Sequence, residues 1–129
     1  MSQIFLVHDQ QASPAARRSA LERAGWRVRT TRDGLECLAW LRLEKPELVV
    51  LDVLLEGKNG FDLCRMIRDR YTAQELPVVL GCHVYQDPEH EAEARAAGAQ
   101  HYLQLPVALD ELVQTVAELT RDIRGVHAA

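Results

Sequence analysis

Side chains that could bind a ligand or take part in a reaction lie at the ends of short apolar runs of the sequence. They are carboxylates, imidazoles and a thiol: His8, Asp9, Asp52, Cys82 and His83. In an open parallel α/β sheet, ligands and chemistry gather at the carboxyl ends of the strands. The set resembles ligands for a transition metal, and we keep such a site as a remote alternative, because strand-end neighbours seldom form a tetrahedral site by accident.

The elements that must position these residues are five short apolar runs, each followed by a helical pattern. The runs are residues 4–7, 26–30, 48–51, 78–80 and 101–104. Run 48–51 is apolar without alternation, which is typical of a strand buried on both faces. Run 26–30 alternates with arginines and is expected at an edge. The alternation predicts an α/β, doubly wound (βα)5 domain, a five-stranded parallel sheet with helices on both faces.

Local signals predict where the helices begin. Ser13 and Pro14 are an N-cap and a first helical residue, and Asp33 and Asn59 are typical caps for the next two helices. Asp87 precedes Pro88 in the same way before the fourth helix. We place one domain at residues 1–123, with residues 124–129 as a tail or linker remnant.

Composition narrows the class of protein. The 129 residues are 47% hydrophobic and 26% charged, as in a soluble globular domain. The formal charge of −4 gives no electrostatic reason to expect nucleic acid or an anionic membrane as a partner. No apolar run is long enough to span a membrane, no export signal is evident, and three cysteines suit reduced thiols. We therefore expect a cytoplasmic protein.

At this point the chain resembles the response-regulator receiver (CheY-like) domains of two-component signalling, which have a flavodoxin-like fold. The resemblance covers nearly all of the chain. It rests on the turn at His8-Asp9, the LVVLD strand end at Asp52 and a glycine eight residues later, Gly60. It continues with a PVVL fourth strand and an aromatic, Tyr102, three residues before Leu105-Pro106.

The resemblance implies that Asp52 is the phosphoacceptor. A carboxylate can attack a phosphoryl donor if the charge on the transferring group is neutralised. In the family a Mg²⁺ ion does this, and the matching ligands here are Asp9, Asp52 and the backbone carbonyl of Leu54. The implied partners are a histidine kinase or another signalling protein. A second implied contact is a homodimer through the face of the fourth helix, fifth strand and fifth helix, near Tyr102.

Three positions depart from the family pattern. His8 replaces a second acid, and we expect it to be a polar strand-end residue bonded to a neighbouring carbonyl. Cys82 replaces a threonine or serine and is expected to be a small packing residue. Leu105 replaces the lysine that pairs with the acceptor or its phosphate, so Asp52 is expected to lose its cationic neighbour. Tyr102 keeps the position of the switch aromatic, and the Leu105-Pro106 bond matches one that is often cis.

Two functions follow from these departures, and neither is an enzyme beyond self-phosphorylation or dephosphorylation of an aspartate. The first is an atypical receiver that acts by regulated protein–protein interaction, with weakened or absent phosphorylation switching. The second is a receiver that still accepts a phosphoryl group on Asp52 from a histidine kinase. We favour the first because Leu105 and Cys82 remove a cation and a hydroxyl donor, and losing one such donor typically costs about 10²–10³ in rate. An ammonium group from elsewhere in the chain that reaches Asp52 would rescue ordinary switching and overturn this preference. A flavodoxin-like FMN enzyme is disfavoured, because the turn at residues 8–14 lacks the glycines of a phosphate cradle.

Overall fold

The computed structural model describes residues 2–9, 13–84 and 87–128, with side chains of the last helix described as far as Thr120. Strands and helices alternate along the described chain. The strands are β1 (Gln3–Val7), β2 (Arg27–Thr31), β3 (Leu48–Asp52), β4 (Val78–Cys82) and β5 (His101–Gln104). The helices are α1 (Ala15–Arg23), α2 (Gly34–Leu43), α3 (Gly60–Arg68), α4 (Pro88–Ala96) and α5 (Leu109–Ala128).

All strand pairs are parallel, and the sheet order is β2-β1-β3-β4-β5. This confirms the doubly wound prediction. The alternating strand β2 lies at an edge, as its arginines indicated, and β3 lies at the centre with all five residues buried. The chain leaves β1 outward to β2 and returns to β3 on the other side. The carboxyl ends of β1 and β3 therefore lie side by side at the switch in strand order, where ligands bind in such sheets.

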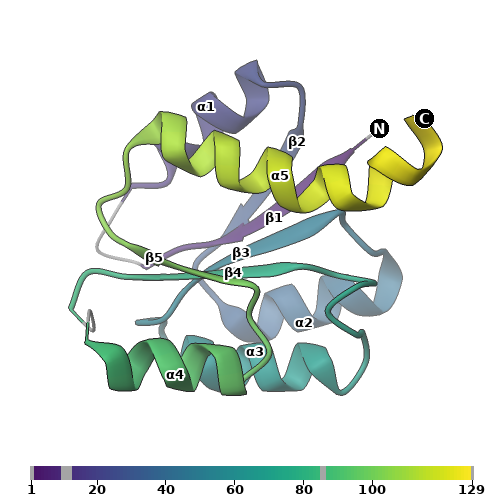
Figure 1. Cartoon of the computed structure of the whole chain (residues 1–129). Coiled ribbons are helices and arrows are strands. Elements are labelled where there is room, and N and C mark those ends of the chain that lie inside the picture. Colours follow the sequence, from purple (N-terminus) through teal and green to yellow (C-terminus); the bar gives the residue numbers. More distant parts are fainter. Residues whose placement is uncertain (1, 10–12, 85–86, 129) are drawn as a thin grey trace.

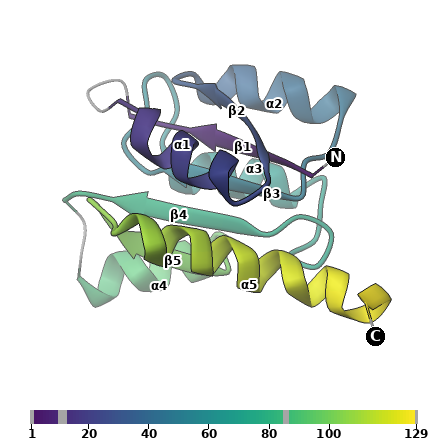
Figure 2. The same cartoon turned by 90° about the horizontal axis from the view of Figure 1, so that it is seen from above.

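The helices cover both faces of the sheet. Helices α1 and α5 lie on one face, and α2, α3 and α4 lie on the other (Figures 1 and 2). Alternate side chains of the central strands point to opposite faces. Phe5, Leu51 and Leu80 accordingly pack in the core against α2–α4, whereas Ile4 and Val50 pack in the core against α1 and α5.

The predicted helix caps hold at three of four helices. Asp33, Asn59 and Asp87 each accept a backbone N–H of the first turn, at 2.7–2.9 Å. At α1 the boundary differs by one residue. The helix begins at Ala15 after Pro14, and Ser13 Oγ accepts the Ala15 N–H at 3.2 Å.

The end of the chain differs from the predicted tail. Helix α5 continues through residues 124–128, and the proposed boundary at 123 remains a prediction. Residues 10–12 of the turn that was contrasted with a phosphate cradle lie outside the described residues. In the part of the chain that the structure describes, no helix is both long enough and apolar enough to span a bilayer.

Candidate functional site

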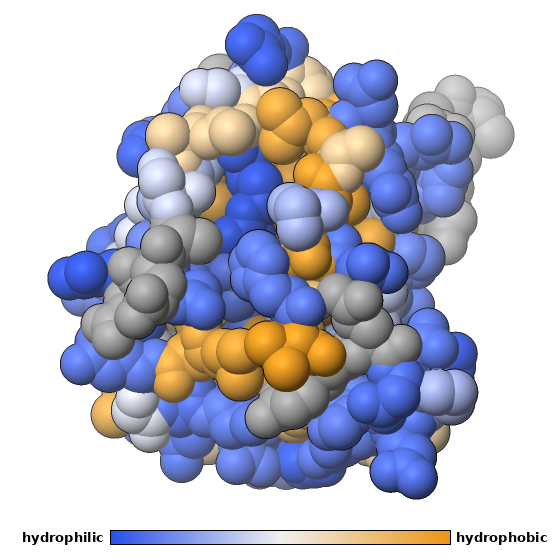
Figure 3. Space-filling model, turned by 90° about the vertical axis from the view of Figure 1, so that its left-hand side faces the viewer, coloured by the Kyte–Doolittle hydropathy of each residue, from blue (hydrophilic) through white to orange (hydrophobic). Residues whose placement is uncertain are grey.

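Asp52 is the last residue of the central strand and lies at the carboxyl edge of the sheet. Its carboxylate is 2% exposed. The backbone N–H of Asp9, beyond the end of β1, donates to Asp52 Oδ2 at 2.9 Å. The structure thus brings together the two aspartates that the sequence placed at neighbouring strand ends. In Figure 3, which faces this edge, hydrophilic side chains lie at the centre with apolar groups above and below.

Arg17 provides the main charge partner of Asp52. Its Nη1 lies 2.8 Å from Oδ1, and its Nη2 lies 2.9 Å from Oδ2. This is the bidentate pairing in which both guanidinium donors meet both carboxylate oxygens. The Arg17 side chain is 11% exposed, so the pair is largely shielded from water. The prediction that Asp52 lacks a cationic neighbour is therefore wrong, because the cation comes from α1.

A signal for Arg17 exists in the sequence. In a doubly wound sheet the first helix begins directly after the carboxyl end of the first strand. Arg17 lies in the first turn of α1, three residues beyond Pro14, so the fold sets it over the strand ends. A long cationic side chain at that point can reach the central carboxylate.

Leu105 follows β5, lines a pocket together with Arg17 and is buried. A Cβ added to Gly81 would lie 3.2 Å from three atoms of the Leu105 side chain, so the leucine packs directly over that glycine of β4. Its backbone N–H donates to the carbonyl of Cys82 at 3.0 Å, and the Leu105-Pro106 bond is cis. An aliphatic contact thus fills the position for which the resemblance implied a lysine.

The side chains of Cys82 and Tyr102 interact across neighbouring strands, Cys82 as the last residue of β4 and Tyr102 as the second residue of β5. Cys82 is buried in the core, as expected for a small packing residue. The pKa of Tyr102 is raised, first by burial of its ring and then by Cys82, with which its side chain forms a hydrogen bond. The ring also stacks on Phe61 at a centroid distance of 6.3 Å. Tyr102 therefore points toward the thiol and the start of α3.

His8 is buried and bonded to the backbone around it. Its ring Nδ1 lies 3.1 Å from the carbonyl oxygen of Asp9, to which a protonated Nδ1 would donate. The backbone N–H of His8 donates to the backbone carbonyl of Thr31 at 2.9 Å. This is the arrangement expected of a polar strand-end residue. His8 also lines an open hollow beside β2 and α2, away from Asp52.

Gly60 fixes the loop that follows Asp52. A Cβ at this position would lie 2.5 Å from the carbonyl oxygen of Asp52 and 2.6 Å from Val53 Cα, closer than real side chains come. The Gly60 N–H donates to the Val53 carbonyl at 2.8 Å. Only glycine permits the start of α3 to approach β3 this closely, which gives a physical reason for the glycine in the motif.

The arrangement does not fit a metal ion as it stands. Both Asp52 oxygens accept hydrogen bonds from Arg17, and Oδ2 also accepts one from the Asp9 N–H. Mg²⁺ requires oxygen ligands in near-octahedral geometry, so it would have to displace the guanidinium. The remote transition-metal hypothesis is not supported either. Within the described ranges, no three histidine, cysteine, aspartate or glutamate side chains are grouped so that they could hold a metal ion.

Comparison with known proteins agrees with this geometry. Residues 4–117 match the family described as "Response regulator receiver domain". The chain is 32% identical over 127 residues to "Response regulator MprA" of Mycobacterium bovis, covering 98% of this chain and 54% of that protein. It is 34% identical over 119 residues to "Transcriptional regulatory protein AfsQ1" of Streptomyces coelicolor, covering 90% and 51%. The chain thus spans about half the length of these relatives.

Solved structures show the same likeness. A protein of Chloroflexus aurantiacus described as a "putative response regulator" superposes with a TM-score of 0.83 at 28% identity, covering 92% of this chain and 97% of the other. Several observations support the same family: the fold, the two aspartates at the switch in strand order, the close approach of Gly60 to β3, and the family match over residues 4–117. The chain belongs to the response regulator receiver domain family of two-component signalling.

Proposed function

We propose that this receiver domain signals by regulated protein–protein interaction and that Arg17 holds its acceptor aspartate in an unphosphorylated, charge-neutralised state. The observation that carries the proposal is the bidentate pair between Arg17 and Asp52, at 2.8 and 2.9 Å. Asp52 is the residue that the family resemblance assigns as phosphoacceptor. In this chain its charge is already balanced by a residue of the same domain.

The pair opposes phosphorylation for two reasons. The attacking oxygen must reach the phosphoryl donor, and the metal cation that neutralises the donor must bind the same carboxylate. The Arg17 guanidinium contacts both oxygens of that carboxylate, so it obstructs the approach of the donor and repels a second cation. A hydrogen bond to a charged group contributes roughly 1.5–3 kcal/mol. If the guanidinium holds the carboxylate by about 2 kcal/mol, the fraction of free Asp52 falls roughly thirtyfold.

The residues that would transmit a phosphate signal are also changed. The family resemblance places a hydroxyl at Cys82 and a lysine at Leu105. A thiol is a weak donor, and a leucine offers neither charge nor hydrogen bond. Leu105 packs over Gly81, and Tyr102 is bonded to Cys82. These contacts support a surface near Tyr102 that is held in one arrangement by packing.

The same cation favours a second candidate function, because a cation from another element was expected to restore ordinary switching. We keep docking as the main proposal because Arg17 is a guanidinium bonded to both oxygens of Asp52, not an ammonium group beside it. Arg17 is 11% exposed and belongs to a different element from the family's lysine. It could release Asp52, admit Mg²⁺ and then pair with a phosphoryl group received from a histidine kinase. Arginine forms strong bidentate contacts with phosphate as well as with carboxylate. In this function Arg17 takes the place of the lysine, and ordinary switching survives.

Beryllofluoride with Mg²⁺, an analogue of a phosphoryl group on aspartate, separates the two functions. We expect no saturable amide shifts at residues 9, 52 and 82 in the wild-type chain. We expect saturable shifts in Arg17→Ala and in Arg17→Lys, because lysine keeps the charge but cannot grip both oxygens. Arg18→Ala is the control, since Arg18 pairs with Glu22 on an exposed surface.

The opposite result identifies the second function. Saturable shifts in the wild-type chain that are lost or weakened in Arg17→Ala would show that Arg17 assists binding of the analogue. Asp52→Asn must abolish the shifts in every variant. The dispersion of the amide spectrum reports whether each variant is folded.

A further inference from the structure

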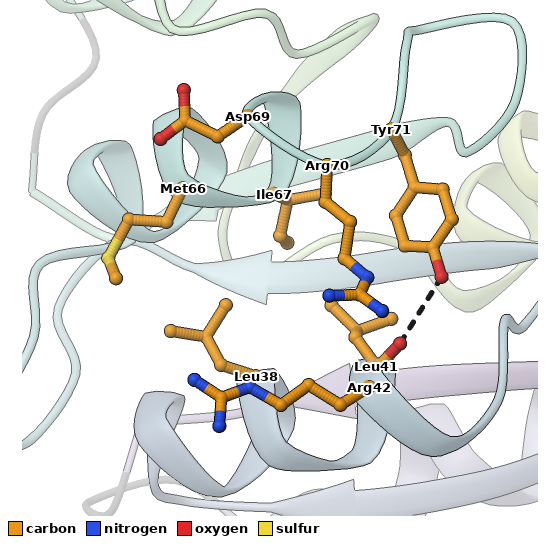
Figure 4. A pocket seen from close by; sticks show the side chains of 8 residues that line it. All are labelled: Leu38, Leu41, Arg42, Met66, Ile67, Asp69, Arg70 and Tyr71. Carbon is orange, nitrogen blue, oxygen red and sulfur yellow. Dashed lines mark hydrogen bonds between the residues drawn. The ribbon is translucent and has the colours of Figure 1, made fainter.

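A hollow of about 340 Å³ lies between α2 and α3, on the face of the sheet opposite α1 and α5. It is formed by the later turns of both helices and the three residues that follow α3, residues 69–71. The lining residues, drawn in Figure 4, are Leu38, Leu41, Arg42, Met66, Ile67, Asp69, Arg70 and Tyr71. Neither Asp52 nor Arg17 belongs to this set, so the hollow is separate from the receiver site.

The floor of the hollow is apolar and partly fixed in place. Leucine, isoleucine and methionine side chains from the two helices face each other across it (Figure 4). The Tyr71 hydroxyl donates to the Leu41 carbonyl at 3.2 Å, which ties the ring to α2. Met66 is 38% exposed, so part of the apolar lining is open to solvent. The apolar floor is therefore accessible from solvent.

Two guanidinium groups, Arg42 and Arg70, border this floor. Among the described residues, neither guanidinium has an ion pair or a hydrogen bond to another side chain or to the backbone. The carboxylate of Asp69 is directed away from both of them (Figure 4). Arg70 lies 6.0 Å from the centre of the Tyr71 ring. The hollow thus joins an apolar floor to two cations with unused donors.

We infer that this hollow binds a small amphipathic anion, a carboxylate or phosphate group carried on an apolar body of about one ring. Ligand pockets are typically about 300–1,000 Å³ and combine an apolar lining with a few polar groups that fix orientation, so this hollow suits a ligand at the small end. Guanidinium groups recognise carboxylate and phosphate through paired donors. The inference is independent of the proposed function, because it involves neither Asp52 nor the fourth helix.

Amide shifts during titration with simple probes test the inference. The probes are phenyl phosphate and phenylacetate, with 2-phenylethanol lacking the charge and inorganic phosphate lacking the ring. We expect both ring-bearing anions to give saturable shifts at residues 38, 41, 67 and 71. We expect the other two probes to bind at least about tenfold more weakly, as the loss of one charge-assisted contact implies. The tighter of the two anions identifies whether the natural ligand carries phosphate or carboxylate.

Variants separate binding in the hollow from general attraction to a basic surface. Arg42→Gln and Arg70→Gln change exposed side chains and leave the apolar floor intact. Each is expected to weaken binding of the tighter anion about tenfold. Arg23→Gln, which changes an exposed arginine in the last turn of α1, is the matched control and should leave binding unchanged. Equal binding of 2-phenylethanol would overturn the inference. So would anion binding that survives the Arg42→Gln, Arg70→Gln double variant, or shifts confined to other residues.

Discussion

At the residue scale, the two partners of the central ion pair are unequally buried. Asp52 is 2% exposed and cannot reach water without moving β3, whereas Arg17 is 11% exposed and extends from the first turn of α1. Removing one partner of a buried pair leaves an uncompensated charge, and this typically costs about 3–5 kcal/mol. The cost depends on whether the remaining charge can find solvent. Here the aspartate cannot, and the arginine can.

The two truncations should therefore differ in stability. We expect Arg17→Ala to lower the free energy of unfolding by about 3 kcal/mol, and Asp52→Ala to lower it by less than about 1 kcal/mol. The double variant should recover most of the loss, because no buried charge remains unpaired. Urea denaturation of the four proteins measures the coupling. Arg18→Ala, which breaks an exposed pair with Glu22, should cost under about 0.5 kcal/mol. An Arg17→Ala cost no larger than this control would contradict the assignment.

Two buried cysteines give a prediction about alkaline pH. Burial raises the pKa of Cys64 to about 11 and that of Cys37 to about 12, from an ordinary value of 9.0. Both thiols stay protonated in the folded protein near pH 8, so we expect iodoacetamide to label neither until urea is added. Because the unfolded thiols ionise first, their contribution to stability is complete below about pH 9 and declines as the pH rises toward 11–12.

Replacing the two cysteines tests whether their thiols cause the loss of folding stability at alkaline pH. The double variant Cys37→Ala, Cys64→Ala should lose the part of the decline that they cause. Denaturation midpoints at about pH 8 and pH 10 are compared for the two proteins. Rapid labelling of either thiol in the native chain would show that the site is open to solvent.

At the element scale, Arg68 joins the end of α3 to the amino edge of the sheet. It donates to the carbonyl oxygens of Leu76 at 2.7 Å and Gly98 at 2.8 Å, and to Oε1 of Gln100 at 3.0 Å. The same Gln100 oxygen accepts the N–H of Val78 at 2.8 Å. Burial lowers the pKa of Arg68, which reflects the cost of taking its charge out of water. The carbonyl contacts offset that cost.

Removing this group should loosen the edge formed by β4 and β5. We expect Arg68→Met to lower the free energy of unfolding by about 2–3 kcal/mol, because several partly buried carbonyls lose their donor at once. Amide exchange should accelerate at residues 76–79 and 98–101. Arg65→Met is the matched control one turn earlier, where the partners Asp62 and Glu93 are exposed, and it should cost under about 1 kcal/mol. Equal losses in the two variants would refute the role of Arg68.

Among the helices and strands, some features could be predicted from the sequence and others could not. The cap at Asn59, the edge position of residues 27–31 and the buried strand at 48–52 follow from signals within a few residues. The place of Arg17 in the first turn of α1 also follows from the sequence, but its contact with Asp52 does not follow from local signals, because it joins residues 35 apart in the chain and depends on where α1 lies over the sheet. Family comparison directs attention to Leu105, where the cation is usual. The replacement arrives from another element, which position-by-position comparison cannot detect.

At the scale of the whole molecule, the face made by α4, β5 and α5 is the surface for which the family resemblance implies partners. A small recess of about 130 Å³ between α4 and β5 is lined by residues that include Glu91, Arg95 and Tyr102. Glutamate and arginine on one face can pair with their counterparts on a second copy related by twofold symmetry.

Charge reversal at this face tests whether the surface is used. We expect Arg95→Glu to weaken self-association of the chain about tenfold or more, because like charges then meet across the twofold axis. Sedimentation equilibrium at several concentrations measures the dissociation constant. Arg23→Glu, an exposed arginine at the end of α1, is the control and should leave it unchanged. A chain that remains monomeric at about 1 mM, or one that is equally affected by both reversals, would exclude a symmetric dimer through this face and leave a different protein as its partner.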